Sequence, residues 1–157
     1  MAHRENIELQ GPPRVHALGD VHRQLAEWNL KMPDVEPLVL DFGLDDFVNI
    51  GETEFWVANE TEHGYCGKFL FVFDDQTCPY HHHKVKHETF FVVKGEVRMI
   101  IEDEERDLEE GASVVMPPNT GHSFTGLGPA LILEVSMPSV PGDSYFRNRE
   151  IGDDGVI

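Results

Sequence analysis

The sequence has few cysteines, no long apolar run and few basic residues, and each shortage excludes a class of protein. Cys66 and Cys78 are too few for a disulfide framework, and they fit a reducing compartment. No stretch approaches about eighteen consecutive apolar residues, so we expect no transmembrane helix and no membrane partner. The 12 Lys and Arg residues against 29 Asp and Glu residues give a net charge of −17. Because such a surface repels phosphate backbones, we expect no nucleic-acid partner.

The sequence does contain enough apolar material for one compact domain. Hydrophobic residues make up 40% of the 157 residues and aromatic residues 10%, which excludes a mainly disordered chain. The first residues are polar and lack the apolar stretch of a signal peptide, so we expect a cytoplasmic protein. We divide the chain into an N-terminal arm and helix (1–36), a β-barrel (37–140) and a C-terminal tail (141–157).

The N-terminal part predicts an arm followed by one short helix. Residues 1–17 are polar and carry Gly11-Pro12-Pro13, a run that favours an extended or poorly ordered start. From Asp20 to about Lys31, apolar residues recur at the spacing of an amphipathic helix. Asp20 can cap the first turn, and Pro33 just beyond the segment is a stop signal.

After Pro37 the pattern changes to many short β-rich segments separated by turn residues. Val, Ile, Phe and Thr dominate these segments, as a pleated and half-buried surface prefers. Frequent short strands without alternating long helices favour an all-β sandwich or barrel. The segments expected to be strands are residues 38–42, 54–58, 68–73, 89–93, 96–101, 113–116 and 130–136.

The most informative segment holds four of the nine histidines: His81, His82, His83 and His87. On a strand, residues i and i+2 point to the same face, so His81 and His83 can aim two imidazoles into one pocket while His82 points away. Glu88 follows after enough chain for a tight bend to return its carboxylate to the same point. Two imidazoles and a carboxylate suit Mn, Fe, Co, Ni or Zn, whereas the alternative is a solvated polar loop without a metal.

A lone histidine further along the chain, His122, can supply a third imidazole. It follows a strand-like run and the turn Pro117-Pro118-Asn119, and an aromatic residue comes soon after it. On its own, such a histidine is more often a hydrogen-bonded structural residue than a ligand. Together with the first cluster it supplies the imidazole that the candidate site lacks.

These two segments resemble the paired motifs of the cupin superfamily. The first motif has two histidines flanking one residue, then a glutamate and then a glycine, which is Gly95 here. The second motif runs from a glycine, here Gly111, to a histidine; Asn119 replaces its turn glycine and Gly126 its closing asparagine. The resemblance covers about residues 64–137. It implies an all-β fold, a single cupin jelly-roll barrel (double-stranded β-helix) with six to eight strands, and a metal site of His81, His83, Glu88 and His122.

A longer stretch, from about residue 38 to 137, resembles the D-lyxose ketol-isomerase type of sugar-isomerase cupin. Segments 40–43, 65–68, 76–79 and 134–136 carry this match. That family interconverts D-lyxose and D-xylulose with a divalent metal. The resemblance implies a small sugar substrate, one divalent transition metal (manganese first, with Fe, Co, Ni or Zn as alternatives) and a homodimer. The family carries a longer insertion between its motifs near the pocket mouth, so the substrate can differ here.

The function that we expect is a metal-dependent aldose–ketose isomerase acting through a metal-stabilised enediolate. Such an enzyme needs a base over the C1–C2 edge of the sugar. Glu134 lies in an alternating run and would point inward, and a buried carboxylate is costly unless it has a role or a partner. The resemblance adds Lys86, at a position where a family lysine is thought to contact a substrate oxygen; an ordinary exposed lysine is the alternative.

Two other functions fit the same residues. Three histidines and one glutamate also suit an iron-dependent dioxygenase that acts on an enediol-like substrate. The third class is a cupin that binds a sugar or a metal without catalysis. An inward-pointing Glu134 favours catalysis over binding alone, and the narrower resemblance favours the isomerase.

Overall fold

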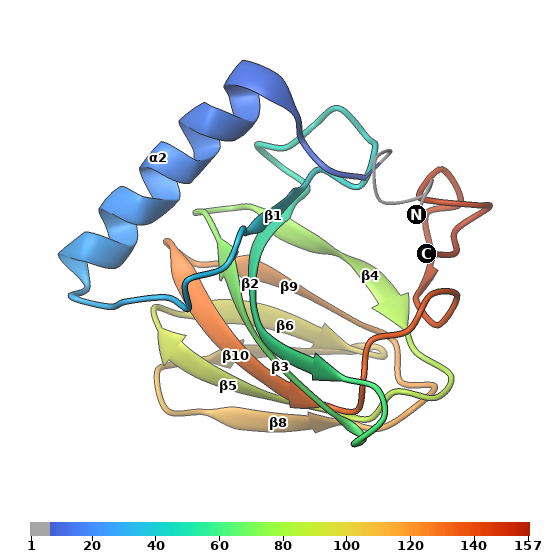
Figure 1. Ribbon diagram of the computed structural model, residues 1–157. Helices are drawn as coiled ribbons and strands as arrows, with labels where there is room; N and C mark the ends of the chain where they lie inside the picture. Colours follow the sequence, from blue (N-terminus) through green and yellow to red (C-terminus); the bar gives the residue numbers. More distant parts are fainter. Residues whose placement is uncertain (1–6) are drawn as a thin grey trace.

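Two antiparallel sheets face each other in the computed structural model, which describes residues 7–157 (Figure 1). Helix α2 (Gly11–Glu27) comes before them in the chain. The strands are β1 (Leu38–Leu40), β2 (Glu52–Glu60), β3 (Tyr65–Val72), β4 (Thr77–His82), β5 (Glu88–Lys94), β6 (Val97–Ile101), β7 (Glu104–Leu108), β8 (Ser113–Met116), β9 (His122–Gly126), β10 (Ala130–Ser136) and β11 (Tyr145–Phe146).

The strand order identifies a jelly roll. The larger sheet has the order β1-β2-β3-β10-β5-β8, and the smaller sheet has the order β11-β4-β9-β6-β7. All named strand pairs are antiparallel, and β10 lies between β3 and β5 although it follows them in sequence. The predicted all-β fold is therefore confirmed. This topology places segments from both halves of the chain next to one another on the inner faces of the two sheets.

The N-terminal helix begins earlier than the sequence predicts. We expected an arm over residues 1–17 and a helix from Asp20, but α2 already begins at Gly11. Pro12 and Pro13 stand in its first turn, where a missing N–H costs no helical hydrogen bond, so they start the helix instead of breaking it. The helix ends before Lys31 because Asn29 adopts left-handed backbone (φ 57°). The first six residues of the expected arm lie outside the described residues.

Helix α2 packs on the outer face of the larger sheet. Its buried Val21 and Leu25 form a cluster with Phe55, Phe71 and Leu131 from β2, β3 and β10. Burial of each such side chain contributes on the order of 1.5–3 kcal/mol, so this contact holds the helix without a capping side chain. In the part of the chain that the structure describes, no helix is both long and apolar enough to cross a bilayer.

The sequence located most of the strands but not all of them. All seven expected segments overlap strands, namely β1, β2, β3, β5, β6, β8 and β10. Strand β7 was missed because it is an exposed edge strand whose residues are mostly charged, without an apolar alternation. Strand β9 was missed because its burial does not alternate, and β11 because it has only two residues. Strand β4 was anticipated only around His81, because it contains a proline and an irregular register.

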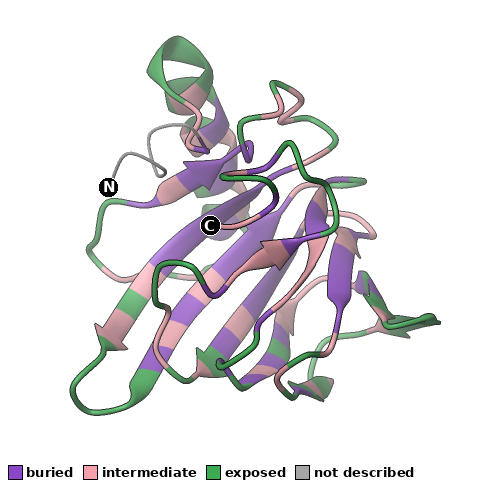
Figure 2. Cartoon of the chain, turned by 90° about the vertical axis from the view of Figure 1, so that its right-hand side faces the viewer, coloured by how far each residue is buried: buried purple, intermediate pink, exposed green. Residues whose placement is uncertain are grey.

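The inner faces of the two sheets form the main core and also carry the polar residues of a site. Figure 2 shows buried and exposed residues alternating along the strands. Phe90, Met99 and Phe124 are among the apolar residues buried between the sheets. Several charged or ionisable side chains are buried with them, including Glu54, Lys68, Glu88, His122 and Glu134. Buried ionisable groups need partners or a ligand, so they mark the functional region.

Candidate metal centre and pocket

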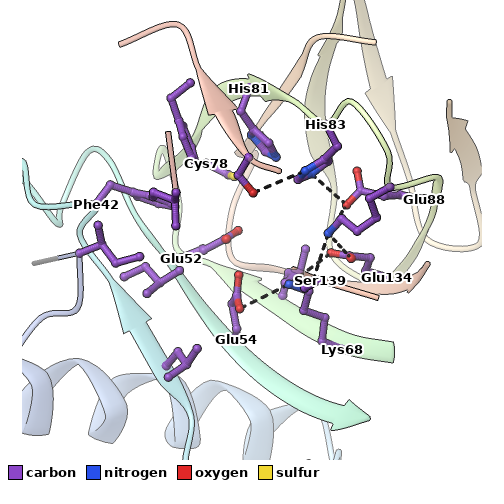
Figure 3. Close-up of a pocket in the computed structure, with 18 of the residues that line it drawn as sticks. Phe42, Glu52, Glu54, Lys68, Cys78, His81, His83, Glu88, Glu134 and Ser139 are labelled. Carbon is purple, nitrogen blue, oxygen red and sulfur yellow. Dashed lines mark hydrogen bonds and ion pairs between the residues drawn. The ribbon is translucent and has the colours of Figure 1, made fainter. Parts of the chain in front are cut away.

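A cavity of about 670 Å³ opens between the two sheets, and its wall has a polar and an apolar part (Figure 3). The apolar part includes Leu38, Leu40, Phe42 and Leu70. The polar part includes His81, His83, Lys68, Lys86, Glu88 and Glu134. The expected site residues of the first motif therefore border the same cavity as the glutamate of β10.

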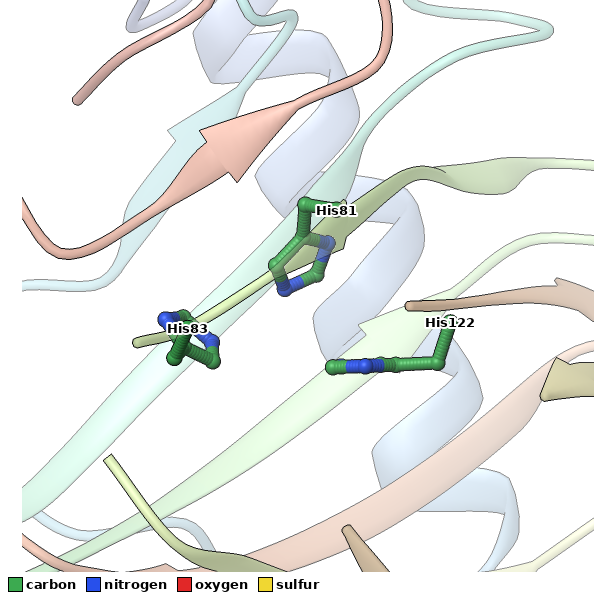
Figure 4. Close-up of side chains that lie close together, drawn as sticks. All are labelled: His81, His83 and His122. Atoms are coloured by element: carbon green, nitrogen blue, oxygen red, sulfur yellow. The ribbon is translucent and has the colours of Figure 1, made fainter. Parts of the chain in front are cut away.

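Strand pairing brings the histidine cluster and the lone histidine together. His81 on β4 is the register partner of His122 on β9, and His83 follows just after the end of β4. One ligand atom from each of the three imidazoles lies within 4.8 Å of the others (Figure 4). The structure thus contains the three-histidine cluster that the two sequence motifs predict.

Backbone oxygens fix the orientation of all three imidazoles. A carbonyl oxygen can only accept a hydrogen bond, so each Nδ1 carries the proton and each Nε2 keeps a free lone pair. This is the tautomer in which a histidine binds a metal through Nε2. The Nδ1 atoms of His81, His83 and His122 lie 2.8, 2.9 and 2.9 Å from the carbonyl oxygens of Pro79, Asp143 and Thr120.

The electrostatics of the cluster favour the neutral imidazoles of His81 and His122 and the ionised carboxylate of Glu88. Burial, together with the imidazoles of His122 and His83, lowers the pKa of His81 well below its usual value. Burial also lowers the pKa of His122. Burial alone would raise the pKa of Glu88, but the adjacent His83 and Lys86 outweigh it and hold that pKa well below its usual value. Neutral imidazoles and a carboxylate are the forms that bind a cation.

The carboxylate of Glu88 lies next to two of the three imidazoles. Its Oε1 lies 3.3 Å from Nε2 of His83, and its Oε2 lies 3.4 Å from Nε2 of His122. Among residues 7–157, neither of these Nε2 atoms nor Oε2 of Glu88 has a hydrogen-bond partner, and all three atoms are buried. Buried lone pairs that face one another are costly unless a cation lies between them. Nitrogen and carboxylate donors together suit Mn, Fe, Co, Ni or Zn.

The turn of the second motif supports the first motif directly. Asn119 adopts left-handed backbone (φ 63°), as expected for the position where the cupin motif has a glycine. Its backbone N–H donates to the carbonyl oxygen of His83 at 2.6 Å. The replacement of glycine by asparagine is therefore tolerated, and the turn holds the chain at His83 in place.

Lys86 is buried between two carboxylates and is not an exposed lysine. Its side chain is 6% exposed, and its Nζ lies 2.8 Å from Oε1 of Glu88 and 3.0 Å from Oε1 of Glu134. Ser136 also donates its hydroxyl to Oε1 of Glu134 at 2.8 Å. Glu134 is buried and borders the cavity, so it points inward as its place in the alternating run predicts.

A second lysine extends this network across the larger sheet. Lys68 on β3 is the register partner of Glu134 on β10, and its Nζ lies 3.9 Å from Oε2 of Glu134. The same Nζ lies 3.6 Å from Oε2 of Glu54 on β2. Burial would lower the pKa of Lys68, but Glu134 and Glu54 outweigh it and raise that pKa, so the lysine stays cationic.

Other polar residues of the first motif lie away from the cluster. His82 stacks on Tyr145 with ring centroids 5.3 Å apart, which agrees with the expected outward direction, and His87 is exposed. The ring of Tyr80 lies 3.7 Å from the Arg147 guanidinium, and Tyr80 does not border the cavity described above.

Three buried acidic residues near the site were missed in the sequence. Glu52 and Glu54 of β2 border the cavity, and Asp143 follows in the C-terminal tail. The spacing of Glu52 and Glu54 places them on the same face of a strand, but it does not show whether that face points into the barrel. Nothing in the sequence around Asp143 pointed to a contact with the loop after His83.

Comparison with known proteins gives one family match, one sequence relative and two structural matches. The cupin domain family matches residues 69–136. A D-lyxose/D-mannose isomerase from Thermosediminibacter oceani is 31% identical, in an alignment that covers 72% of this chain and 77% of that protein. The fold matches an L-ribose isomerase variant from Acinetobacter sp. in complex with L-ribose (TM-score 0.65, 17% identity, 79% of each chain). It also matches a sugar phosphate isomerase of the cupin superfamily from Silicibacter pomeroyi (TM-score 0.52, 16% identity, 62% of this chain and 66% of that one).

The jelly roll and the three-histidine cluster together define a cupin with a candidate metal site. The chain belongs to the cupin superfamily, and the relative at 31% identity is a sugar isomerase. The resemblance that the sequence carries is thereby confirmed at the level of the family. The two structural matches fall below 25% identity and show the fold alone.

Proposed function

We propose that the protein is an aldose–ketose isomerase that uses one divalent transition metal, with manganese as the first candidate. The observation that carries the proposal is the position of Glu134. This buried carboxylate shares Lys86 with Glu88, so an acid–base group lies directly beside the candidate metal centre. The sugar-isomerase relative supports the same reaction class.

His81, His83, Glu88 and His122 would hold the metal. They offer neutral nitrogens and one carboxylate, and the unpartnered buried atoms of this set call for a cation. When bound, a divalent ion supplies Lewis acidity that stabilises the negative charge of an enediolate. With four protein donors, such an ion would keep coordination positions for substrate oxygens.

Glu134 is the proposed base, and Lys86 is the proposed electrostatic partner. In the direction from aldose to ketose, the carboxylate takes the proton from C2 and returns it to C1, while a hydroxyl proton passes from O2 to O1. No atom is gained or lost in this exchange. The ammonium group of Lys86, which lies 3.0 Å from Oε1 of Glu134, would stabilise the charge that develops on the substrate oxygens.

The charges of the cavity favour a free sugar over a sugar phosphate. Among the described residues, the cavity is lined by more glutamates than lysines, and both lysines, Lys68 and Lys86, are paired with glutamates. A phosphate dianion needs unpaired cationic groups, especially the forked donors of arginine. We therefore propose a neutral aldose, with D-lyxose and related pentoses first and D-mannose next.

The test combines metal reconstitution with a sugar panel. Metal-stripped protein is loaded with Mn²⁺, or anaerobically with Fe²⁺, and given free aldopentoses, free aldohexoses and their phosphates. Formation of ketose and consumption of oxygen are followed together. We expect ketose from a free aldose without oxygen uptake. Oxygen uptake that needs Fe²⁺ and an organic substrate would instead identify the dioxygenase, and tight sugar binding without turnover would identify a binding protein.

A further inference from the structure

Two carboxyl groups that the proposed reaction does not use point into the cavity from β2. Glu52 and Glu54 are 5% and 6% exposed, and Figure 3 shows both side chains directed into the cavity, across from Glu88. Their register partners on β1 are Leu40 and Leu38, which belong to the apolar part of the wall. A pair of acidic groups in an apolar wall is costly unless it has a function there.

The two carboxyl groups differ in how readily they hold a proton. Burial and the adjacent Glu54 raise the pKa of Glu52 well above its usual value. For Glu54 the effect of burial is outweighed by Lys68, so the pKa of Glu54 is lowered. The proton of the pair is therefore favoured on Glu52, which in that form donates a hydrogen bond to the Glu54 carboxylate. The indole Nε1 of Trp56 donates to Oε2 of Glu54 at 2.5 Å.

The carboxyl group of Glu52 is directed into the cavity (Figure 3), and it also forms a side-chain hydrogen bond with Cys78. In the described part of the chain, Oε2 of Glu52 is buried and has no hydrogen-bond partner. In the protonated form that the raised pKa favours, the hydroxyl of Glu52 donates to Glu54, and the remaining oxygen can accept a hydrogen bond but carries no charge that would attract a cation. The complementary ligand group is a hydroxyl of a neutral molecule.

Glu52 and Glu134 border the same cavity. Lys68 bridges the two regions, because its Nζ lies 3.6 Å from Glu54 and 3.9 Å from Glu134. The carbon chain of a pentose spans about 5 Å from C1 to C5. A sugar whose C1–C2 edge lies beside Glu134 can therefore extend its other end toward β2.

We propose that Glu52, held by Glu54, is a specificity subsite that binds the terminal hydroxyl of the sugar, at the end remote from the reacting carbons. The inference rests on the proposed function for the placement of the reacting end. The ligand class is a neutral polyhydroxy chain. A sugar without the terminal hydroxyl leaves Oε2 of Glu52 buried and unpaired, so the subsite discriminates against it.

The test measures binding without turnover. Reduced D-lyxose and reduced 5-deoxy-D-lyxose cannot isomerise because they lack the carbonyl group, and they differ only in the terminal hydroxyl. Their dissociation constants are measured by calorimetry on Mn²⁺-loaded protein. We expect the wild-type protein to bind the complete pentitol at least about tenfold more tightly.

Substitutions of Glu52, with one control at Glu60, assign this preference to Glu52. Glu52→Gln should keep the preference for the complete pentitol, because the amide NH₂ can donate to Glu54 while the amide oxygen stays available to the ligand. Glu52→Met removes the acceptor at similar volume and brings the ratio of the two constants to about one. Glu60→Met, on the exposed end of the same strand, matches the wild type. Glu52→Ala repeats the comparison if the methionine variant does not fold.

Each outcome decides the subsite separately from the reaction. A wild-type ratio near one, or an unchanged preference in a folded Glu52→Met or Glu52→Ala variant, overturns the subsite, as does failure of the pentitol to bind. If the preference depends on Glu52 but no aldose is isomerised, the subsite stands and the proposed reaction fails. If an aldose is isomerised and the preference does not depend on Glu52, the proposed reaction stands and the subsite fails.

Discussion

The backbone carbonyl oxygen of Asp143 accepts the Nδ1 proton of His83 at 2.9 Å, although 60 positions separate the two residues. The carboxylate of Asp143 accepts the backbone N–H groups of Lys84 and Val85 through Oδ1 and that of Lys86 through Oδ2. One residue of the C-terminal tail therefore orients an imidazole of the candidate metal centre and shapes the loop that carries Lys86. The tail belongs to the site and does not merely follow the barrel.

The first prediction concerns Asp143. Asp143→Ala leaves three N–H groups without their acceptor, so we expect the free energy of unfolding to fall by about 1–3 kcal/mol. Because the loop also positions His83, we expect the affinity for Mn²⁺ to fall roughly 10- to 100-fold. Asp143→Asn keeps one acceptor oxygen and should lie between the alanine variant and the wild type. Chemical denaturation and Mn²⁺ titration measure the two effects, and an alanine variant with wild-type metal affinity would contradict this role.

The second prediction concerns the third imidazole of the cluster. His122→Ala removes the buried Nε2 atom, which has no hydrogen-bond partner among residues 7–157. We therefore expect bound metal to fall well below one ion per chain. The fold survives, because the apolar core between the sheets remains, and the circular dichroism spectrum should be unchanged. His87→Ala, at an exposed position, is the matched control and should keep its metal. Equal metal content in both variants would place the metal elsewhere.

The third prediction separates catalysis from metal binding. In Glu134→Gln, the amide oxygen can still accept hydrogen bonds from Lys86 and Ser136, but the side chain can no longer take up a proton. We expect kcat for the isomerisation to fall about 10²- to 10⁴-fold while the metal content stays unchanged. Glu60→Gln on the exposed end of β2 controls for the substitution itself. A glutamine variant with full activity would remove Glu134 from the reaction.

The fourth prediction concerns the dependence of stability on pH. The pKa of Glu52 is raised in the folded protein above its ordinary value of 4.5, so between these two pKa values the folded state binds more protons than the unfolded state. The stability that Glu52 contributes is complete below pH 4.5 and is lost as the pH rises through the folded pKa. Glu52→Gln removes this loss, so its free energy of unfolding relative to wild type should increase with pH from 4.5 up to the folded pKa of Glu52 and then stay constant.

This pH effect is measured by urea denaturation of metal-free protein over a series of pH values. Both proteins contain the same histidines, so the difference between their curves isolates Glu52. Glu60→Gln should run parallel to the wild type, because its side chain is exposed in the folded protein. A constant difference between wild type and Glu52→Gln across the series would show that Glu52 is ionised in the folded state.

The metal centre could be predicted from the sequence because local rules determine most of it. The alternation of a strand places His81 and His83 on one face, and a turn with left-handed backbone at Asn119 comes before His122. What the sequence did not reveal depends on contacts between distant segments. The protonation of Glu52 depends on burial beside Glu54, and the role of Asp143 depends on where the tail returns to the barrel.

Two further local features have simple physical causes. A Gly-Pro-Pro run usually breaks a helix, but Pro12 and Pro13 begin one here, because the N–H groups of the first helical turn have no hydrogen-bond acceptor within the helix. Gly126 stands where the second cupin motif often has an asparagine. A Cβ atom at this position would lie 2.3 Å from the carbonyl oxygen of Phe73, so only glycine fits against this backbone.

The pairing of His81 with His122 links metal binding to the folding of the smaller sheet. The two residues are register partners on β4 and β9. If β9 slipped by one residue, His122 would turn to the opposite face and its nitrogen would leave the cluster. An ion bound by both histidines would stabilise only chains in which these strands are correctly aligned. Metal binding would therefore favour the correct strand register over a shifted one during folding.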